Sequence, residues 1–231
     1  MLEELKQTVC KANLDIVKHG LVIHTWGNVS ARDCESGLIV IKPSGVSYDS
    51  MKPADMVVID PDGKIAEGRY KPSTDAPTHL YLYKAWPSIG CVVHTHSSYA
   101  TAWAQAGKDI PPLGTTHADH YYGEVPCTRL LTKKEIESDY ELNTGKIIVE
   151  RIGSVNPLTI PSVLVKAHAP FCWGSDADNA VYNAVALEEI ARLAFYTVLL
   201  GKSEPIEKYL LNKHFNRKHG SDAYYGQGKT K

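Results

Sequence analysis

The sequence predicts an α/β fold: a single-domain α/β/α sandwich with a central, mainly antiparallel or mixed sheet. Helical apolar periodicity alternates along the chain with short β-rich segments, and several of these segments are adjacent hairpin partners. A chain of 231 residues can bury a substantial core, and no convincing linker interrupts it. We therefore expect one domain over 1–231, with a short mobile tail at about 226–231.

The first half of the chain predicts one helix followed by short strands. Apolar residues recur at helical spacing from Leu2 to Val17, and Gly20 then stops the helix. Runs rich in aliphatic and β-branched residues come next, and they predict strands at 21–25, 38–41, 56–60 and 64–66. Pro61-Asp62-Gly63 predicts the hairpin turn between the last two strands.

The second half predicts helices around two further strands. The expected elements are a helix at 77–85, a strand at 91–96, a helix at 98–106 and a strand at 163–168. A long helix follows, because Ser175 and Asp178 have capping-box spacing and a broad apolar stripe then continues to Gly201.

The composition argues against several classes of protein. A 43% hydrophobic and 22% charged chain is typical of a globular protein, and a net charge of −1 argues against nucleic-acid binding. The basic stretch 213–219 is interpreted as a solvated helix face. Five scattered cysteines without a CxxC pair predict reduced thiols. Because there is neither a signal-peptide apolar region nor a run of about 18 apolar residues, we expect a cytoplasmic protein that binds no membrane.

The most informative motif is His94-Thr95-His96, which ends the apolar run 90–93. Alternate side chains of a strand point to the same face, so both imidazoles lie on one side, with roughly 7 Å between their Cα atoms. Neutral imidazoles at this spacing can bind one metal ion. The motif alone fits two solvated histidines at a strand end equally well.

A third histidine, His168, also ends a predicted strand and extends the pair to a candidate ligand set. Three imidazoles around a divalent ion, with room for substrate, are typical of catalytic zinc. Three unrelated polar strand ends remain the alternative. Asp75 stands at the start of the predicted helix 77–85, where a carboxylate by itself is better explained as an N-cap than as a ligand.

Three loops combine small residues with hydroxyl or amide groups. They are Gly27-Asn28, Ser44-Gly45 and Ser73-Thr74, and Lys42 stands two residues before the second. The backbone N–H groups of such loops can approach a phosphate closely. Each loop alone fits an ordinary turn. Together with a histidine metal site, the loops predict a phosphorylated small-molecule substrate.

These residues resemble the class II aldolase/adducin superfamily and, within it, the L-ribulose-5-phosphate 4-epimerases. The resemblance covers nearly the whole chain through the segments 25–30, 41–46, 71–75, 93–97, 114–119, 217–220 and 223–227. The sequence departs from the family pattern at two positions. Thr74 stands where the family often has serine, and Ala169 stands where it usually has glycine. Neither change removes a chemical group that the family's reaction needs.

The resemblance implies a class II aldolase fold and roles for individual residues. The implied metal ligands are Asp75, His94, His96 and His168, usually for zinc, with manganese or cobalt as other divalent ions that could serve. The implied substrate and phosphate-binding residues are Gly27, Asn28, Lys42, Ser44, Gly45, Ser73 and Thr74. Asp119 and Tyr225 match the family's acid/base pair, and Arg217 and His214 match site residues that come from a neighbouring subunit. The family also implies a C4 homotetramer with active sites between adjacent subunits.

The reaction that the resemblance implies interconverts L-ribulose 5-phosphate and D-xylulose 5-phosphate by cleaving and re-forming the bond between carbons 3 and 4. One alternative is a class II aldolase acting on fuculose or rhamnulose 1-phosphate, whose relatives place a glutamate base where this chain has Asp75. The other is a non-enzymatic scaffold like adducin, against which the three histidines count. The sequence leaves open whether the pathway is arabinose, ascorbate or xylulose catabolism.

Overall fold

One antiparallel sheet forms the centre of the protein. The computed structural model describes residues 2–221 and 223–225. Within them, seven strands form a sheet of order β4-β3-β2-β1-β5-β7-β6, and each strand is antiparallel to its neighbours. The strands are β1 (Gly27–Arg32), β2 (Ile39–Ile41), β3 (Val57–Ile59), β4 (Ile65–Glu67), β5 (Cys91–Thr95), β6 (Ser162–Leu164) and β7 (Pro170–Gly174).

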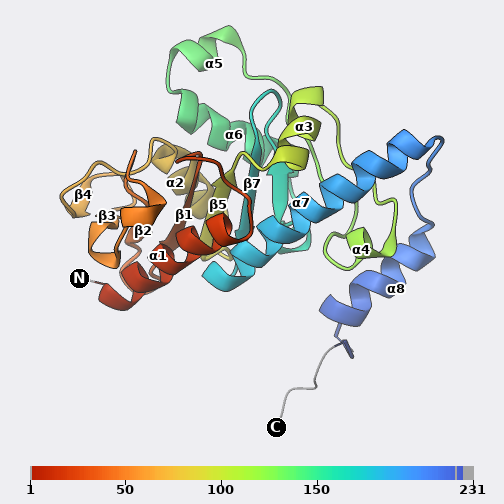
Figure 1. Ribbon diagram of the computed structural model, residues 1–231, viewed down its shortest axis with the longest axis horizontal. Helices are drawn as coiled ribbons and strands as arrows, with labels where there is room; N and C mark the ends of the chain where they lie inside the picture. Colours follow the sequence, from red (N-terminus) through yellow and green to blue (C-terminus); the bar gives the residue numbers. More distant parts are fainter. Residues whose placement is uncertain (1, 222, 226–231) are drawn as a thin grey trace.

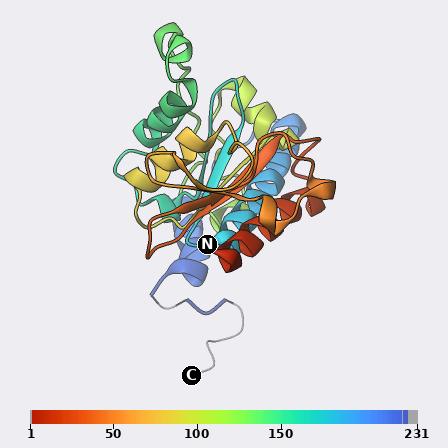
Figure 2. The same cartoon turned by 90° about the vertical axis from the view of Figure 1, so that its left-hand side faces the viewer.

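Helices cover both faces of this sheet (Figures 1 and 2). One face carries α1 (Glu3–Lys18), α3 (Ser98–Ala106) and α7 (Ala177–Leu200), and the other carries the packed pair α2 (Ala76–Ala85) and α6 (Tyr140–Ile152). The remaining helices are α4 (Thr115–Ala118), α5 (Lys133–Glu137) and α8 (Lys208–His219). The short α4 packs on α8 to one side of the sheet (Figure 1).

The sheet separates two hydrophobic cores, because successive strand residues point to opposite faces. Val40 and Val93 belong to the core under α1, α3 and α7, whereas Ile41 and Val92 belong to the core under α2 and α6. The structure thereby confirms the predicted α/β/α sandwich, with a sheet that is antiparallel throughout.

Most of the predicted elements are confirmed, with bounds that shift by one or two residues. They are the first helix, the strands at 38–41, 56–60, 64–66 and 91–96, and the helices at 77–85, at 98–106 and before Gly201. The basic stretch 213–219 does lie on a helix, α8. Neither α6 nor the full extent of α8 was predicted. The predicted tail at 226–231 lies outside the described residues.

The strand predicted at 21–25 is wrong. This segment is a loop that turns at His24, whose φ is 54°, and the Trp26 N–H donates to the Ile23 carbonyl at 3.1 Å. The strand begins only at Gly27. This strand is almost entirely buried, but it consists largely of glycine, asparagine, serine and alanine, so it does not form the apolar run that predicts a buried strand.

Two predictions near His168 and Ser175 also need correction. The strand predicted at 163–168 ends at Leu164, and residues 165–169 form a tight turn in which the His168 N–H donates to the Val165 carbonyl at 2.9 Å. His168 therefore lies on the β6–β7 turn rather than at a strand end. The N-cap of α7 is Asp176, whose carboxylate accepts the Asn179 N–H at 2.8 Å, and not Ser175.

A buried asparagine holds β1 against the first helix. Asn13 is fully buried; its Nδ2 donates to the carbonyls of Val9 at 2.8 Å and Val29 at 3.2 Å, and its Oδ1 accepts the Val29 N–H at 2.9 Å. The same strand begins at Gly27, where a Cβ would lie only 2.4 Å from the Val22 side chain and 3.0 Å from the His94 carbonyl. These contacts fix the start of β1 closely against β5.

We expect Asn13→Ala to lower the free energy of unfolding by about 1–3 kcal/mol, the cost of leaving a buried backbone donor unsatisfied. Urea denaturation at fixed protein concentration measures this change. Gln7→Ala is the matched control, because Gln7 is exposed on the same helix; it should change stability by no more than about 0.5 kcal/mol. Equal stability of the two variants would contradict the role given to Asn13.

Candidate active site

The pairing of β1 with β5 brings the first site residues together. Asn28 lies opposite His94 in this pairing, and His96 follows the end of β5. The β6–β7 turn adds His168. The three imidazoles form a triangle, with ring centroids 5.0 Å apart for His94 and His96, 4.9 Å for His94 and His168, and 5.1 Å for His96 and His168. One nitrogen from each ring lies within 4.8 Å of the others.

Neighbouring groups fix the orientation of two of these rings. His94 Nδ1 lies 2.9 Å from the Pro170 carbonyl oxygen, and the His94 ring stacks on Phe171 with centroids 4.1 Å apart. A carbonyl oxygen only accepts hydrogen bonds, so Nδ1 is the donor, and in the neutral form of this ring Nε2 is the nitrogen with the free lone pair. His168 Nδ1 lies 3.4 Å from the Tyr140 hydroxyl. Such outer hydrogen bonds orient the imidazole ligands of metal ions.

The charge state of the histidines suits a metal ion. Burial, together with the adjacent His94 and His96 rings, lowers the pKa of His168 to about 4. Burial and the His94 ring likewise hold the pKa of His96 below its ordinary value. Both rings are therefore neutral at neutral pH, which is the form that binds metals. Three imidazoles that meet in this way fit a divalent ion such as zinc.

Asp75 lies beside this histidine set. It precedes α2, but its side chain makes no capping hydrogen bond within the described residues. Its Oδ2 instead accepts from Asn28 Nδ2 at 2.7 Å and lies 4.0 Å from His94 Nε2. Burial disfavours the carboxylate, yet the nearby imidazoles and the Asn28 amide leave its pKa below the usual value. The position of Asp75 before a helix suggested an N-cap, and that interpretation is wrong. Its role as a metal ligand stays a prediction.

A cavity of about 680 Å³ opens in front of these residues, and we call it the histidine cavity. All four predicted metal ligands line it, as do the predicted substrate and phosphate-binding residues Gly27, Asn28, Lys42, Ser44, Gly45, Ser73 and Thr74. Five further lining residues, Thr25, Trp26, Pro43, Tyr140 and Glu141, were given no role from the sequence. The first three lie inside motifs of the family resemblance, whereas no pattern pointed to Tyr140 or Glu141.

Backbone hydrogen bonds hold two of the three predicted phosphate loops side by side. The Ser44 N–H donates to the Lys71 carbonyl at 3.0 Å, and the Ser73 N–H donates to the Lys42 carbonyl at 2.9 Å. Gly45 has a φ of 69°, a conformation that glycine adopts readily. The structure therefore brings the Ser44-Gly45 and Ser73-Thr74 loops to one wall of the histidine cavity.

Lys42 lies beneath these loops and is almost fully buried. Its Nζ donates to the carbonyls of Pro43 at 3.2 Å and Val46 at 3.0 Å and lies 4.8 Å from the centroid of the Tyr48 ring. Burial lowers the pKa of Lys42 to about 8. The ammonium group thus remains mostly charged at neutral pH and supplies positive charge close to the loops.

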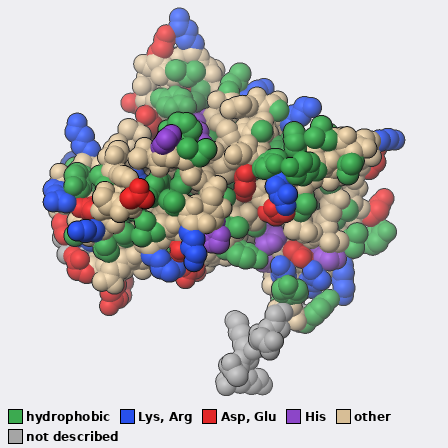
Figure 3. Space-filling model, in the orientation of Figure 1, with side chains coloured by type: hydrophobic (Ala, Val, Ile, Leu, Met, Phe, Trp, Pro, Cys, Tyr) green, Lys and Arg blue, Asp and Glu red, His purple; other side chains and the backbone are tan. Residues whose placement is uncertain are grey.

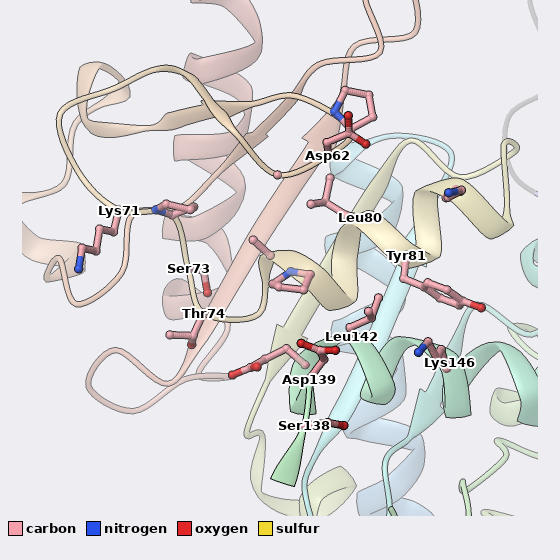
Figure 4. Close-up of a pocket in the computed structure, with 17 residues that line it drawn as sticks. Asp62, Lys71, Ser73, Thr74, Leu80, Tyr81, Ser138, Asp139, Leu142 and Lys146 are labelled. Atoms are coloured by element: carbon pink, nitrogen blue, oxygen red, sulfur yellow. The ribbon is translucent and has the colours of Figure 1, made fainter. Parts of the chain in front are cut away.

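A second hollow, of about 890 Å³, adjoins the histidine cavity between α2 and α6. It shares Ser73 and Thr74 with that cavity, and Figure 4 shows these side chains on one side of it and Asp139 and Lys146 on the other. The two hollows also share Glu141 and therefore join into one wide groove along this side of the protein.

The remaining predicted residues form a separate group, which we call the Asp119 cluster: Asp119, His214, Arg217 and Tyr225. Arg217 donates to both carboxylate oxygens of Asp119, at 3.0 Å and 2.7 Å, and His214 Nδ1 lies 3.0 Å from Oδ1. The Arg217 guanidinium lies 5.1 Å from the centroid of the Tyr225 ring. Although burial opposes ionisation, the hydrogen bonds from Arg217 and His214 hold the pKa of Asp119 below its usual value.

The two groups do not meet within one chain. In the part of the chain that the structure describes, no member of the Asp119 cluster lines the histidine cavity. Asp119 follows α4, and its partners come from α8 and the segment after it, away from the ends of β5 and β7 (Figure 1). The fold therefore places all the predicted residues in two clusters, one around the imidazoles and one around Asp119.

No helix among the described residues combines the length and the apolar character that crossing a membrane requires.

Comparison with known proteins agrees with this geometry. The model of the class II aldolase and adducin N-terminal domain matches residues 7–195. The L-ribulose-5-phosphate 4-epimerases UlaF of Salmonella paratyphi B and Salmonella typhi are each 59% identical to this chain over 227 residues, which is 98% of this chain and 100% of theirs. These matches confirm the resemblance on which the site residues were predicted.

Solved structures show the same fold at lower identity. An L-fuculose 1-phosphate aldolase superposes with a TM-score of 0.79 at 24% identity, covering 93% of this chain and 95% of the aldolase. The L-fuculose-1-phosphate aldolase of Thermus thermophilus superposes with a TM-score of 0.67 at 23% identity, covering 88% of this chain and 98% of that enzyme. By its sequence and its fold, the chain belongs to the class II aldolase/adducin family.

Proposed function

We propose that the protein is a metal-dependent epimerase that interconverts L-ribulose 5-phosphate and D-xylulose 5-phosphate. The observation that carries this proposal is the joint presence, in one cavity, of three converging imidazoles and two adjacent loops suited to phosphate. The UlaF relatives support the choice of reaction, since they are named for it and are similar over nearly the full chain. The metal proposed for the imidazoles is zinc.

The position of the inverted carbon determines the chemistry. Carbon 4 of a 2-ketose is one atom too far from the carbonyl for its hydrogen to be acidic, so simple deprotonation is a poor route. Cleavage between carbons 3 and 4 avoids this difficulty and yields glycolaldehyde phosphate and an enediolate. A divalent ion, when bound, supplies positive charge that stabilises the enediolate. Recondensation on the opposite face of the aldehyde then inverts carbon 4.

The cavity provides groups for both ends of the substrate. The Ser44-Gly45 and Ser73-Thr74 loops, with the Lys42 charge beneath them, suit the phosphate. At the other end, Asn28 must direct its Nδ2 toward Asp75, because a carboxylate accepts hydrogen bonds and donates none. Its buried Oδ1 has no partner among the described residues. That oxygen is a ready acceptor for a substrate hydroxyl.

Inversion also needs a proton acceptor on one side of the aldehyde and a proton donor on the other. Asp119 and Tyr225 are the residues proposed for these roles. Arg217 and His214 favour the ionised form of Asp119 and so suit it to accept a proton. Because this cluster does not line the histidine cavity of its own chain, we assign it to the cavity of a neighbouring subunit.

An exposed apolar surface on α7 supports assembly into a homotetramer with C4 symmetry. Hydrophobic side chains gather over its second half, and Figure 3 shows them as a continuous patch. Leu199 is 67% exposed and Leu200 is 90% exposed. Contiguous apolar surface of this kind is typical of protein interfaces. The second half of α7 lies beside α4, because residues of both helices line one hollow, so an interface there lies close to Asp119, which follows α4.

Two further proposals concern the chain as a whole. One domain spans 1–231: the histidine set lies on a single sheet, and α4 and α8, which position the Asp119 cluster, pack on each other beside that sheet. The protein is cytoplasmic; all five cysteines, which lie within the described residues, are free thiols, as is usual in a reducing compartment.

The function is tested by an assay that converts L-ribulose 5-phosphate to D-xylulose 5-phosphate. We expect conversion by the purified protein and its loss after treatment with a chelator. His96→Ala should lose both the bound divalent ion, measured by elemental analysis, and turnover, because one of three imidazole ligands is removed. His19→Ala, which changes an exposed histidine at the end of α1, is the control. Steady release of dihydroxyacetone phosphate from a ketose 1-phosphate, without pentulose conversion, would instead indicate an aldolase.

Tyr225→Phe should keep the metal ion and lose at least about 100-fold in kcat, the lower end for loss of acid/base catalysis. Steady-state kinetics and elemental analysis of the same sample measure both quantities. Tyr224→Phe removes the hydroxyl of the adjacent exposed tyrosine and should leave kcat within a few-fold of the wild type. Near-normal turnover of Tyr225→Phe would refute its assignment.

Mixing the inactive variants His96→Ala and Tyr225→Phe tests whether the clusters meet between subunits. After the two proteins are unfolded and refolded together in equal amounts, about a quarter of the sites in a C4 tetramer combine an intact histidine set with an intact Tyr225. Activity should return to about a quarter of the wild-type value. Mixed protein that stays as inactive as either variant, while its mass remains that of a tetramer, would show that each site uses only one chain.

A further inference from the structure

We propose that the Trp26 indole is the wall of the histidine cavity that retains the aldehyde fragment between cleavage and recondensation. This inference rests on the proposed function, because it concerns a step of that reaction. It gives a role to a residue that lines the cavity but belongs to neither the metal-binding, the phosphate-binding nor the acid/base group.

The Trp26 side chain lies at the surface of the histidine cavity and not in a hydrophobic core. Its side chain is 54% exposed although it is the largest type of apolar side chain. Its ring lies 6.5 Å from that of His96, tilted by 56°, and the His24 ring meets it edge-on at 5.5 Å. Among the described residues that line the cavity, Trp26 is the only large hydrophobic side chain that is exposed. The indole thus borders the cavity between a predicted metal ligand and the Gly27-Asn28 loop.

The backbone under this exposed side chain is firmly held. The Trp26 N–H donates to the Ile23 carbonyl at 3.1 Å, and the Gly27 N–H donates to the Thr25 carbonyl at 2.9 Å. The Tyr48 hydroxyl donates to the Gly27 carbonyl at 2.6 Å. His24 is one of three non-glycine residues with positive φ in the described chain, a strained conformation that clusters at functional sites. The indole is therefore presented on a fixed loop.

The reaction creates a need for such a surface. A base takes the proton of the hydroxyl on carbon 4, the bond between carbons 3 and 4 breaks, and its electron pair forms the enediolate while carbon 4 becomes an aldehyde carbon. The aldehyde must then present its other face without leaving. The proposed loops hold the phosphate of this fragment. Directional hydrogen bonds to its aldehyde group would fix one face, whereas a flat aromatic surface restricts escape, excludes water and still permits rotation.

Loss of the wall has a defined chemical consequence. An enediolate that takes up a proton before recondensation becomes dihydroxyacetone, and its partner leaves as glycolaldehyde phosphate. The ratio of these released products to the epimerised pentulose phosphate therefore measures retention separately from the rate of cleavage. A residue that only stabilised the fold would lower both outcomes together and leave this ratio unchanged.

Trp26→Ala should raise the ratio of released glycolaldehyde phosphate to epimerised product at least about tenfold, the lower end of what one lost apolar contact costs in discrimination. Trp26→Phe, which keeps an aromatic face, should stay within a few-fold of the wild type. Ile23→Ala is the matched control, because Ile23 is a 56% exposed apolar residue of the same loop that does not line the cavity. An unchanged ratio in Trp26→Ala would overturn the inference.

Fluorescence gives a readout that needs neither turnover nor metal. Of the four tryptophans, Trp86 and Trp173 are buried, and Trp103 Nε1 donates to the Ala191 carbonyl on α7. Addition of glycolaldehyde phosphate to chelator-treated protein should therefore change the emission of Trp26, and Trp26→Phe should abolish the change. The same change in Trp26→Phe would overturn the inference, even where Trp26→Ala is too inactive for its product ratio to be measured.

The outcomes separate this inference from the proposed function. A wild-type protein that does not interconvert the pentulose 5-phosphates refutes the proposed function itself. A wild type that interconverts them, with an unaltered product ratio in Trp26→Ala, refutes only the role of Trp26. Dissociation of the Trp26→Ala assembly, measured by light scattering, with the ratio unchanged would show that the indole contacts a second subunit instead.

Discussion

The antiparallel pairing of β1 with β5 is the constraint on which the site depends. It places Asn28 opposite His94, and from there Asn28 holds Asp75 by a 2.7 Å hydrogen bond. On its other side β5 pairs with β7, which supplies both the Pro170 carbonyl and the Phe171 ring that orient His94. A one-residue slip of either pairing would turn these side chains to the opposite face. The candidate metal site is therefore as well defined as the centre of the sheet.

Burial disfavours the charged form in both clusters, but local contacts overcome it in only one of them. Around the imidazoles it lowers the pKa of His168 and His96, so the rings stay neutral and keep lone pairs for a metal ion. Around Asp119 it opposes ionisation, but the hydrogen bonds from Arg217 and His214, together with the Lys218 charge, outweigh it and favour the charged carboxylate. Each cluster is thus held in the protonation state that its proposed role requires, by different local contacts.

The sequence predicted those parts of the site whose position follows from the local pattern of apolar and polar residues. His94 and His96 follow from strand alternation, and the long helices follow from apolar periodicity. His168 was singled out from the sequence, but it was predicted at a strand end, whereas it lies on a tight turn that begins after Leu164. The sequence did not reveal this turn, because the apolar run continues and neither glycine nor proline precedes Ala169 there. Tyr140 lines the cavity only because α6 packs on α2, a tertiary contact that no local pattern encodes. Family resemblance, not periodicity, connected Asp75 with the histidines.

The division of the site into two clusters suits a reaction in which one fragment must move. On the proposed mechanism, a single chain binds both ends of the substrate, through the imidazoles and through the loops that the Ser44 and Ser73 N–H groups hold side by side. The piece between these ends has to rotate, so rigid polar contacts from the same chain would hinder it. A neighbouring subunit can bring Asp119 and Tyr225 to the two faces of the aldehyde without being part of that frame. On this proposal, the separation of the clusters in each chain leaves the aldehyde free to rotate.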